Sequence, residues 1–462
     1  MNVSAAALNK IALLCLLVFV GSMYSVLAQT TPSAKSEDAM RLAETAEAVR
    51  KSGDNAKAIK LYTESIAIAP LMVSYYGRAL AYLETKDFAR AKSDLDEAIK
   101  FNGDVSFFYL YRGRALDAIG DCKNAIRDYT KAIELEPQDV EPYLDRGVCY
   151  AIDSEFGKAI ADLDIVIARA PDFAGGYFER GRALAAAGKF EEALLDFNKT
   201  LEIEPKSPPL VSRMRGQAYL ALSRNAEALV DMNRAVEQDP KDAYAYIGRA
   251  SAWLGLWKIA EAHKDIRAAE TIDPKLSDLF IIRAYLYYLL EDNDRVLSES
   301  DQAIVSSPTE ALPHSNRAYA LILKNDLAGA EKEIQKALSL DPKLALGFNN
   351  RALLSTKRRQ YEAALKDTAR ALELDPQMAA AYLNRGQIYL ETGDLESALT
   401  ASSKALQLDP RLRRAYDTRA KVYAKMKRAD LAKADERRSQ ELLAEIVRAR
   451  REIGRPSGSK SK

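Results

Sequence analysis

Hydrophobic and polar positions follow a helical period over most of this chain. The segment from Ala379 to Pro410, AAAYLNRGQIYLETGDLESALTASSKALQLDP, shows it most clearly and predicts two short amphipathic helices. Thr392-Gly393-Asp394 predicts the turn between them. Asp409-Pro410 predicts the end of the second helix, because proline fixes its own backbone and disfavours helical geometry in the residue before it.

This helical pair recurs with a period of 34 residues, marked by prolines that close the second helix. Gly103 takes the place of one proline, with a one-residue deletion before it, and a one-residue insertion precedes Pro240. The closing prolines are Pro70, Pro137, Pro171, Pro205, Pro240, Pro274, Pro308, Pro342, Pro376 and Pro410. Because one pair can bury its apolar face only against its neighbours, the pattern predicts an array of about twelve units over residues 39–446.

Small and large residues at fixed offsets predict where the two helices of a unit touch. Directly after an arginine of the first helix only Gly or Ala occurs, and twelve residues later a second row is Ala with the single exception of Val296. Two matched rows of small side chains let helix backbones approach closely. Three residues before the arginine stand aromatic residues, with Ser212 and His314 as exceptions.

These aromatic, Gly/Ala and closing Pro positions resemble the tetratricopeptide repeat pattern. The resemblance implies an all-α, right-handed superhelical solenoid of about twelve 34-residue helix-turn-helix repeats, whose first helices line a concave groove. It also implies a protein-interaction scaffold or adaptor that binds a partner segment in that groove.

The regular arginines invite a functional interpretation as a ladder for phosphate or another polyanion. A structural interpretation is better supported, because an acid stands sixteen residues after ten of the eleven arginines, and the first unit lacks both. Arg385 is the exception and faces Ala401. The predicted pairs are Arg78 with Asp94, Arg112 with Asp128, Arg146 with Asp162, Arg180 with Asp196, Arg215 with Asp231, Arg249 with Asp265, Arg283 with Glu299, Arg317 with Glu333, Arg351 with Asp367 and Arg419 with Asp435.

The groove-lining offsets of the family predict a mainly apolar and aromatic wall in the middle of the chain. Whether Leu254, Tyr288 and Ile322, which share one offset, pack against neighbouring helices instead stays open. Arg385 is added as the arginine that could borrow Asp367 or bind a ligand. The candidate binding residues are Tyr244, Ile247, Ile281, Tyr285, Leu289, Tyr319, Leu323 and Arg385. A glycan- or lipid-binding envelope protein using the same aromatic groove is the alternative function.

The two ends of the chain differ from the array. Lys10, the apolar run Ile11 to Val20, and Val26-Leu27-Ala28 predict a signal peptide over residues 1–28, followed by a polar linker over 29–38. We therefore expect export, with the bacterial periplasm favoured over secretion or an uncleaved membrane anchor. Residues 447–462 are expected to be a basic helix end and disordered tail.

Charge and rare residues narrow the function further. The 67 Lys and Arg nearly balance the 66 Asp and Glu, which argues against nucleic acid. The last 52 residues carry a net +10, which suits contact with an acidic partner or an anionic membrane surface. No catalytic motif, metal-ligand spacing or cofactor-binding motif is found, so we expect a non-enzymatic protein without cofactors. Cys122 and Cys149 are expected to form one disulfide or to be two buried thiols.

Overall fold

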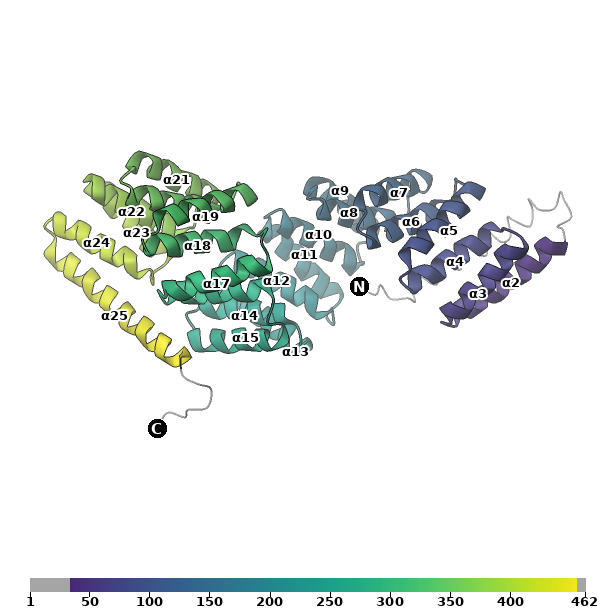
Figure 1. Cartoon of the computed structure of the whole chain (residues 1–462), viewed down its shortest axis with the longest axis horizontal. Coiled ribbons are helices and arrows are strands. Elements are labelled where there is room, and N and C mark those ends of the chain that lie inside the picture. The colour runs from purple at the N-terminus through teal and green to yellow at the C-terminus, as the bar shows by residue number, and fades with distance from the viewer. Residues whose placement is uncertain (1–33, 455–462) are drawn as a thin grey trace, which may run out of the picture. The chain divides into compact units, whose positions relative to one another are not determined.

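The computed structural model describes residues 34–454, and in this range the chain is entirely helical, with helices α2 to α25 and no strand. The helices form two compact units, divided between Lys206 and Ser207, and each unit is a series of antiparallel helical hairpins (Figure 1). The all-α hairpin array predicted from the sequence is thereby confirmed. The predicted signal peptide lies outside the described residues.

The described part of the first unit contains five hairpins. Its helices are α2 Ala34–Lys51, α3 Asn55–Ile68, α4 Met72–Glu84, α5 Phe88–Phe101, α6 Ser106–Ala118, α7 Cys122–Leu135, α8 Glu141–Ile152, α9 Phe156–Arg169, α10 Ala174–Ala186 and α11 Phe190–Ile203.

The second unit contains seven hairpins between Ser207 and the last described residue, Gly454. Its helices are α12 Pro209–Ala221, α13 Asn225–Gln238, α14 Ala243–Gly255, α15 Ile259–Ile272, α16 Ser277–Leu289, α17 Asn293–Ser306, α18 Ala311–Leu323, α19 Leu327–Leu340, α20 Ala345–Lys357, α21 Tyr361–Leu374, α22 Ala379–Thr392, α23 Leu395–Leu408, α24 Arg413–Lys425 and α25 Ala429–Ile453.

The helix ends agree with the sequence pattern except at the start. Gly393 and Asp394 of the predicted turn lie between α22 and α23, whereas Thr392 is the last residue of α22. Helix α25 extends to Ile453, as its continuous apolar period indicates. By contrast, residues 34–38, which the sequence placed in the linker, form the first turn of α2. Glu37 lies in that first turn, where the partial positive charge of the helix N-terminus stabilises an acidic side chain.

Five of the described second helices end at an Asp-Pro step, and the step ends them for a local reason. The residue before the proline is extended, as at Asp409, where φ is −134° and ψ is 95°. Its carboxylate then accepts a hydrogen bond from the backbone N–H two residues later, at 2.8 Å from Arg411. The same bond recurs at Asp239, Asp273, Asp341 and Asp375. The chain is thus turned into the next hairpin by its own side chains.

Small residues provide room in two different ways. At Gly386 an added Cβ would lie 3.2 Å from the backbone nitrogen of Ser402, so here the two helix backbones approach closely. At Gly113 it would lie 2.6 Å from the ring of Tyr129, and at Gly181 it would lie 2.8 Å from Phe197. In those hairpins the glycine accommodates a large side chain of the second helix rather than its backbone.

The buried residues follow the hairpins from one end of each unit to the other, as expected for an array. None of the helices between residues 34 and 454 combines the length and apolar character needed to span a membrane.

Candidate functional site

The arginine row lies on the first helix of every described hairpin except α2–α3, and all its members but Arg385 pair with the second helix of their hairpin. Every Asp partner accepts two hydrogen bonds, from Nε and Nη2 of its arginine, over 2.6–2.9 Å. The two glutamates pair differently: Nε and Nη2 of Arg283 both reach one oxygen of Glu299, at 2.8 and 2.7 Å, and Arg317 reaches Glu333 through Nη1 alone, at 3.2 Å. All ten arginines that have an acid sixteen residues later bind it.

The same arginines are also held from two other sides. The remaining guanidinium nitrogen often reaches the preceding hairpin, as from Arg112 to Asp96 and from Arg180 to Asp164, at 2.7 and 2.6 Å. The aromatic residue three positions earlier lies under the guanidinium, at 5.4 Å between Arg112 and the Tyr109 ring. Because two of their nitrogens commonly bind the acid and the third often reaches the preceding hairpin, these arginines hold hairpins together and are poorly suited to bind phosphate.

Burial makes each pair costly to form as well as costly to break. Burial raises the pKa of Asp94 above its usual value, against the lowering effect of the hydrogen bonds from Arg78. Those bonds raise the pKa of Arg78, so the guanidinium stays charged. Desolvation therefore offsets much of the attraction, while removal of one partner would leave a buried charge uncompensated.

His314 replaces the aromatic residue in its hairpin and adds a second partner for the acid. Its Nδ1 lies 2.6 Å from Oε2 of Glu333, whose Oε1 binds Arg317. Arg317 also reaches Asp301 at 3.0 Å. The histidine thus belongs to the structural ion-pair network, since no other titratable group converges on it among the described contacts.

Arg385 differs from the rest of the row. No carboxylate lies within ion-pair distance of it in the described part of the chain, neither Asp367 nor another. Its guanidinium instead contacts Tyr389 one turn later, at 3.4 Å from Nη2 to the hydroxyl and 5.7 Å from the ring centre. Ala401 is buried opposite, with 6% of its surface exposed. Arg385 is therefore the member of the row without a carboxylate partner among the described residues.

Two of the candidate groove residues meet in a cluster of three tyrosines, Tyr285 and Tyr288 of α16 and Tyr319 of α18, which we call the tyrosine cluster. The Tyr285 and Tyr288 rings stack at 6.2 Å, and Tyr288 meets Tyr319 edge to face at 5.2 Å. Tyr285 remains 42% exposed. The Tyr319 hydroxyl accepts a hydrogen bond of 3.1 Å from Nη1 of Arg414. The cluster offers aromatic surface with a cationic donor at its edge.

The other candidates are dispersed. Tyr244 is 43% exposed. The guanidinium carbon of Arg213 lies 5.3 Å from the centre of the Tyr244 ring. Ile247 and Leu289 pack against the buried core around Leu254 and Leu286, and Ile281 and Leu323 are half-buried. Leu254 and Ile322 are buried, which answers the question left open for them. Of the apolar and aromatic groove wall predicted from the sequence, the structure therefore shows the tyrosine cluster and, apart from it, the exposed Tyr244.

The last hairpin, α24 with α25, folds back onto α15 and α16, a contact that no sequence pattern indicates. Arg413 binds Glu291 through two bonds of 2.9 and 3.0 Å, and Arg450 donates to the carbonyl of Leu290 at 2.7 Å. Arg411 lies 4.3 Å from the ring centre of Trp257. Ile446 joins the same buried core as Leu286. Several basic residues of the C-terminal segment therefore serve to hold the second unit together.

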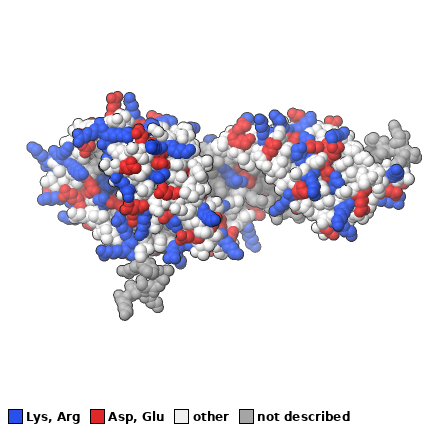
Figure 2. All heavy atoms as spheres, viewed as in Figure 1, with Lys and Arg blue, Asp and Glu red and all other residues white. Residues whose placement is uncertain are grey.

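Other charges of that segment remain at the surface. Lys421, Lys425, Lys433 and Arg437 are exposed. On the face drawn in Figure 2, basic and acidic side chains are interspersed over both units. The net charge of the segment thus overstates the number of basic groups open to a partner.

Comparison with known proteins supports the repeat assignment. Tetratricopeptide repeat models match residues 76–139, 110–163, 153–208, 213–277 and 350–412, and a second such model matches 314–344. Human serine/threonine-protein phosphatase 5 is 32% identical over 103 residues, which are 22% of this chain and 21% of the phosphatase. RNA polymerase II-associated protein 3 from Rattus norvegicus is 36% identical over 107 residues, covering 23% of this chain and 16% of that protein.

The chain thus spans only about a fifth of the length of these curated relatives. Among solved structures, a chain of the APC/C hetero-tetramer Cut9-Hcn1 matches with a TM-score of 0.55 at 16% identity, over 95% of this chain and 98% of that chain. That likeness shows the fold alone. Because the matched repeats cover more than half of the sequence and coincide with the hairpins described above, the chain belongs to the tetratricopeptide repeat family.

Proposed function

We propose that this protein is an exported, non-enzymatic scaffold that binds a segment of a partner protein at the tyrosine cluster. The observation that carries the proposal is the gathering of Tyr285, Tyr288 and Tyr319 around Arg414, with Tyr285 still 42% exposed. Aromatic residues and arginine are enriched where proteins bind proteins, because they combine large apolar area with hydrogen-bonding edges.

The names of the relatives agree with such a role. One is an RNA polymerase II-associated protein, and the structural match comes from a hetero-tetramer. The matched stretch of phosphatase 5 is only 21% of that enzyme, so its activity is not transferred to this chain. A chain built of repeats and lacking a catalytic constellation among its described residues is best suited to hold partners.

A photo-crosslinking amino acid at position 285 tests the binding surface. We expect a crosslinked partner peptide from that position and none from Val305, which lies on α17 of the same hairpin and is 77% exposed. Tyr285→Ala should weaken the captured partner's affinity at least tenfold, while Val305→Ala should leave it unchanged. Equal crosslinking at both positions would contradict the proposal, and retention of saccharide or lipid alone would favour an envelope glycan- or lipid-binding protein.

Export is proposed from the apolar segment before Ala28. We expect the mature protein from a bacterial host to begin at Gln29 and to be released with the periplasmic fraction. Recovery of Met1 in the cytosolic fraction would contradict export, and Met1 in the membrane fraction would indicate an uncleaved anchor.

The exposed basic residues of α24 and α25 are proposed as a secondary contact with an acidic partner or an anionic membrane surface. Binding to vesicles containing anionic lipid, and its loss in high salt, tests the membrane form of this proposal. Lys433→Glu with Arg437→Glu should abolish that binding. Absence of binding at low salt would leave only an acidic protein as the partner to test by crosslinking from position 433.

A further inference from the structure

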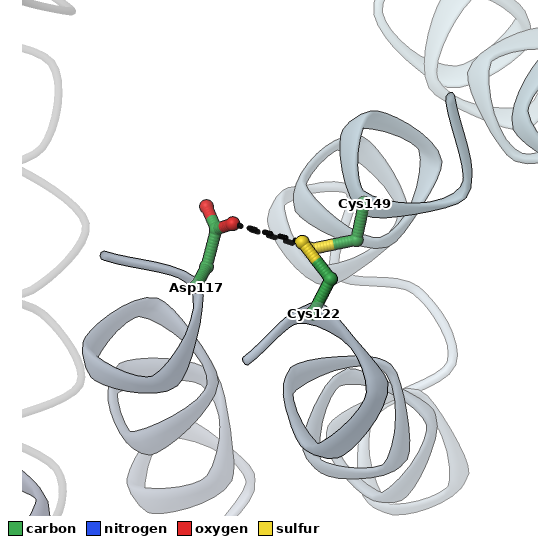
Figure 3. A group of neighbouring side chains, drawn as sticks. All are labelled: Asp117, Cys122 and Cys149. Atoms are coloured by element: carbon green, nitrogen blue, oxygen red, sulfur yellow. Dashed lines mark hydrogen bonds between the residues drawn. The ribbon is translucent and has the colours of Figure 1, made fainter. Parts of the chain in front are cut away.

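The two cysteines of the described chain gather around one carboxylate, Asp117 (Figure 3). Asp117 comes from the end of α6, Cys122 from the first residue of α7, and Cys149 from α8 of the next hairpin. Both sulfur atoms lie close to the same oxygen, Oδ1 of Asp117, at 3.4 Å from Cys122 and 3.5 Å from Cys149. We call these three residues the Cys–Asp cluster.

The other repeats of this chain show that packing does not require these three residues. The position of Asp117 holds no other acid, the position of Cys149 holds only Ala, Leu, Ile or Val elsewhere, and no other unit has a cysteine at the position of Cys122. The equivalents of Asp117 include Leu83, Ala151 and Ala185, those of Cys122 include Phe88, Phe156 and Phe190, and those of Cys149 include Ala81, Ala115 and Ala183. Three residues that no other unit has at these positions therefore converge on one place.

The separations within the cluster suit a tetrahedral metal ion. Zinc binds thiolate sulfur at about 2.3 Å and carboxylate oxygen at about 2.0–2.2 Å, so two such ligands at a tetrahedral angle stand about 3.5 Å apart. The oxygen–sulfur distances are 3.4 and 3.5 Å, and all three ligand atoms lie within 4.8 Å of one another. An ion could be bound with only small movements of the side chains.

A second observation concerns Tyr129, which packs in the same buried cluster as both cysteines and is fully buried. Its hydroxyl has no hydrogen-bond partner among residues 34–454. A buried hydroxyl without a partner is costly, and a water bound to a metal ion would provide one.

We propose that Asp117, Cys122 and Cys149 bind a zinc ion, with the fourth coordination position left to water beside the Tyr129 hydroxyl. Two thiolates and a carboxylate are a ligand set that zinc accepts. Since the ligands come from α6, α7 and α8, the ion joins two successive hairpins of the first unit.

Titration of the reduced, metal-free protein with Co²⁺ tests the site, because cobalt bound to thiolates gives an intense absorption band. We expect one equivalent of Co²⁺ per chain, displaced by one equivalent of Zn²⁺. Asp117→Ala and Cys149→Ala, which introduce the residues of neighbouring repeats, should each weaken binding at least tenfold. Asp121→Asn, which keeps the cap of α7 next to the cluster, should bind as the unchanged protein does.

A triple variant, Asp117→Ala with Cys122→Phe and Cys149→Ala, controls for folding, since it restores the pattern of the neighbouring repeats. Zinc should raise the Tm of the unchanged protein and leave that of the triple variant unmoved. The proposal is overturned if the unchanged protein binds no more Co²⁺ or Zn²⁺ than the triple variant. It is also overturned if protein purified without reductant lacks zinc and has lost two hydrogens to a Cys122–Cys149 disulfide.

Discussion

At the scale of single residues, the guanidinium of Arg249 joins the two helices of its hairpin. Nε and Nη2 each lie 2.7 Å from an oxygen of Asp265, and Nη1 reaches Asn233 of the preceding hairpin at 3.1 Å. Asp265 is 3% exposed. A carboxylate so deeply buried is tolerated because its two oxygens accept bonds from fixed donors.

Asp265→Ala should lower the free energy of unfolding by about 3 kcal/mol, near the lower end for a broken buried pair, because the Arg249 side chain keeps 19% exposure. Urea unfolding followed by circular dichroism measures the change. The control is Glu261→Ala, an exposed acid of the same helix α15, which should shift stability by less than about 0.5 kcal/mol. Equal effects of the two variants would show that the pair does not stabilise the hairpin.

Arg385 allows the opposite experiment, in which a pair is added. Ala401→Asp places a carboxylate where the other units have one, so it should change stability little in the presence of Arg385. In an Arg385→Leu background the same aspartate would be buried without a partner and should cost about 1–3 kcal/mol. A double-mutant cycle measures the coupling. Zero coupling would mean that Tyr389 holds Arg385 away from position 401.

Pairs within one unit could be predicted because their two members appear and disappear together along the repeats. The Cys–Asp cluster could not be predicted this way, since it occurs once. Asp117 and Cys149 are 32 residues apart, and their meeting depends on how one hairpin packs on the next. The Tyr389 contact of Arg385 has the ordinary four-residue helical spacing, but nothing in the sequence indicates that it replaces a carboxylate.

At the scale of elements, each described hairpin turns through one residue with positive φ. Four of these residues are glycines, Gly53, Gly120, Gly188 and Gly393. The other eight are Lys86, Ser154, Ser223, Trp257, Glu291, Asn325, Arg359 and Lys427. A side chain in this left-handed conformation costs roughly 1–2 kcal/mol, which the packing of the two helices outweighs.

Gly393→Ala should therefore destabilise the protein by about 1 kcal/mol through its backbone alone. Its φ is +88°, and no atom lies within 4 Å of the Cβ that the variant adds. Gly157→Ala is the matched control, because its surroundings are equally open but it lies within α9. That variant should be neutral or stabilising by up to about 1 kcal/mol. Thermal unfolding compares the two, and equal Tm values would contradict the backbone argument.

Helix positions were predictable from the sequence because the 34-residue period, the closing proline and the turn residues agree at most units. The backbone conformation of the turn residues could be predicted at fewer positions. Gly393 indicates a left-handed residue, whereas Trp257 and Glu291 give no such local signal and adopt it because the hairpin geometry demands it. An arginine of the C-terminal segment also contacts each of these turn residues, Arg411 at Trp257 and Arg413 at Glu291. No local sequence pattern could indicate these contacts.

At the scale of the whole molecule, contact between distant repeats depends on small rotations that accumulate from one hairpin to the next. Arg413 and Glu291 are 122 residues apart, and their pairing closes the second unit on itself. A slight change in the packing of each intervening hairpin would separate them. The sequence therefore predicts the array within the second unit but not this closure, nor that Arg414 would stand at the edge of the tyrosine cluster.

The closure predicts that α16 and α25 open together when their contacts are weakened. Arg413→Ala removes both bonds to Glu291, whose side chain is 29% exposed, and should weaken the contact by about 1–3 kcal/mol. Amides of residues 286–291 and 446–453 should then exchange with deuterium about tenfold faster or more, since 1.4 kcal/mol corresponds to a factor of ten. Amides of α12 should exchange as before.

Arg437→Ala provides the matched control, because Arg437 is an exposed arginine of α25. It should leave exchange unchanged at both segments. High salt should imitate Arg413→Ala in the unchanged protein, since it screens a partly exposed ion pair, and should have little further effect in the variant. If exchange rises only around position 413, the apolar contact of Ile446 with the core holds α25 in place without the ion pair. The closure would then be an extension of the hydrophobic core and not an electrostatic contact.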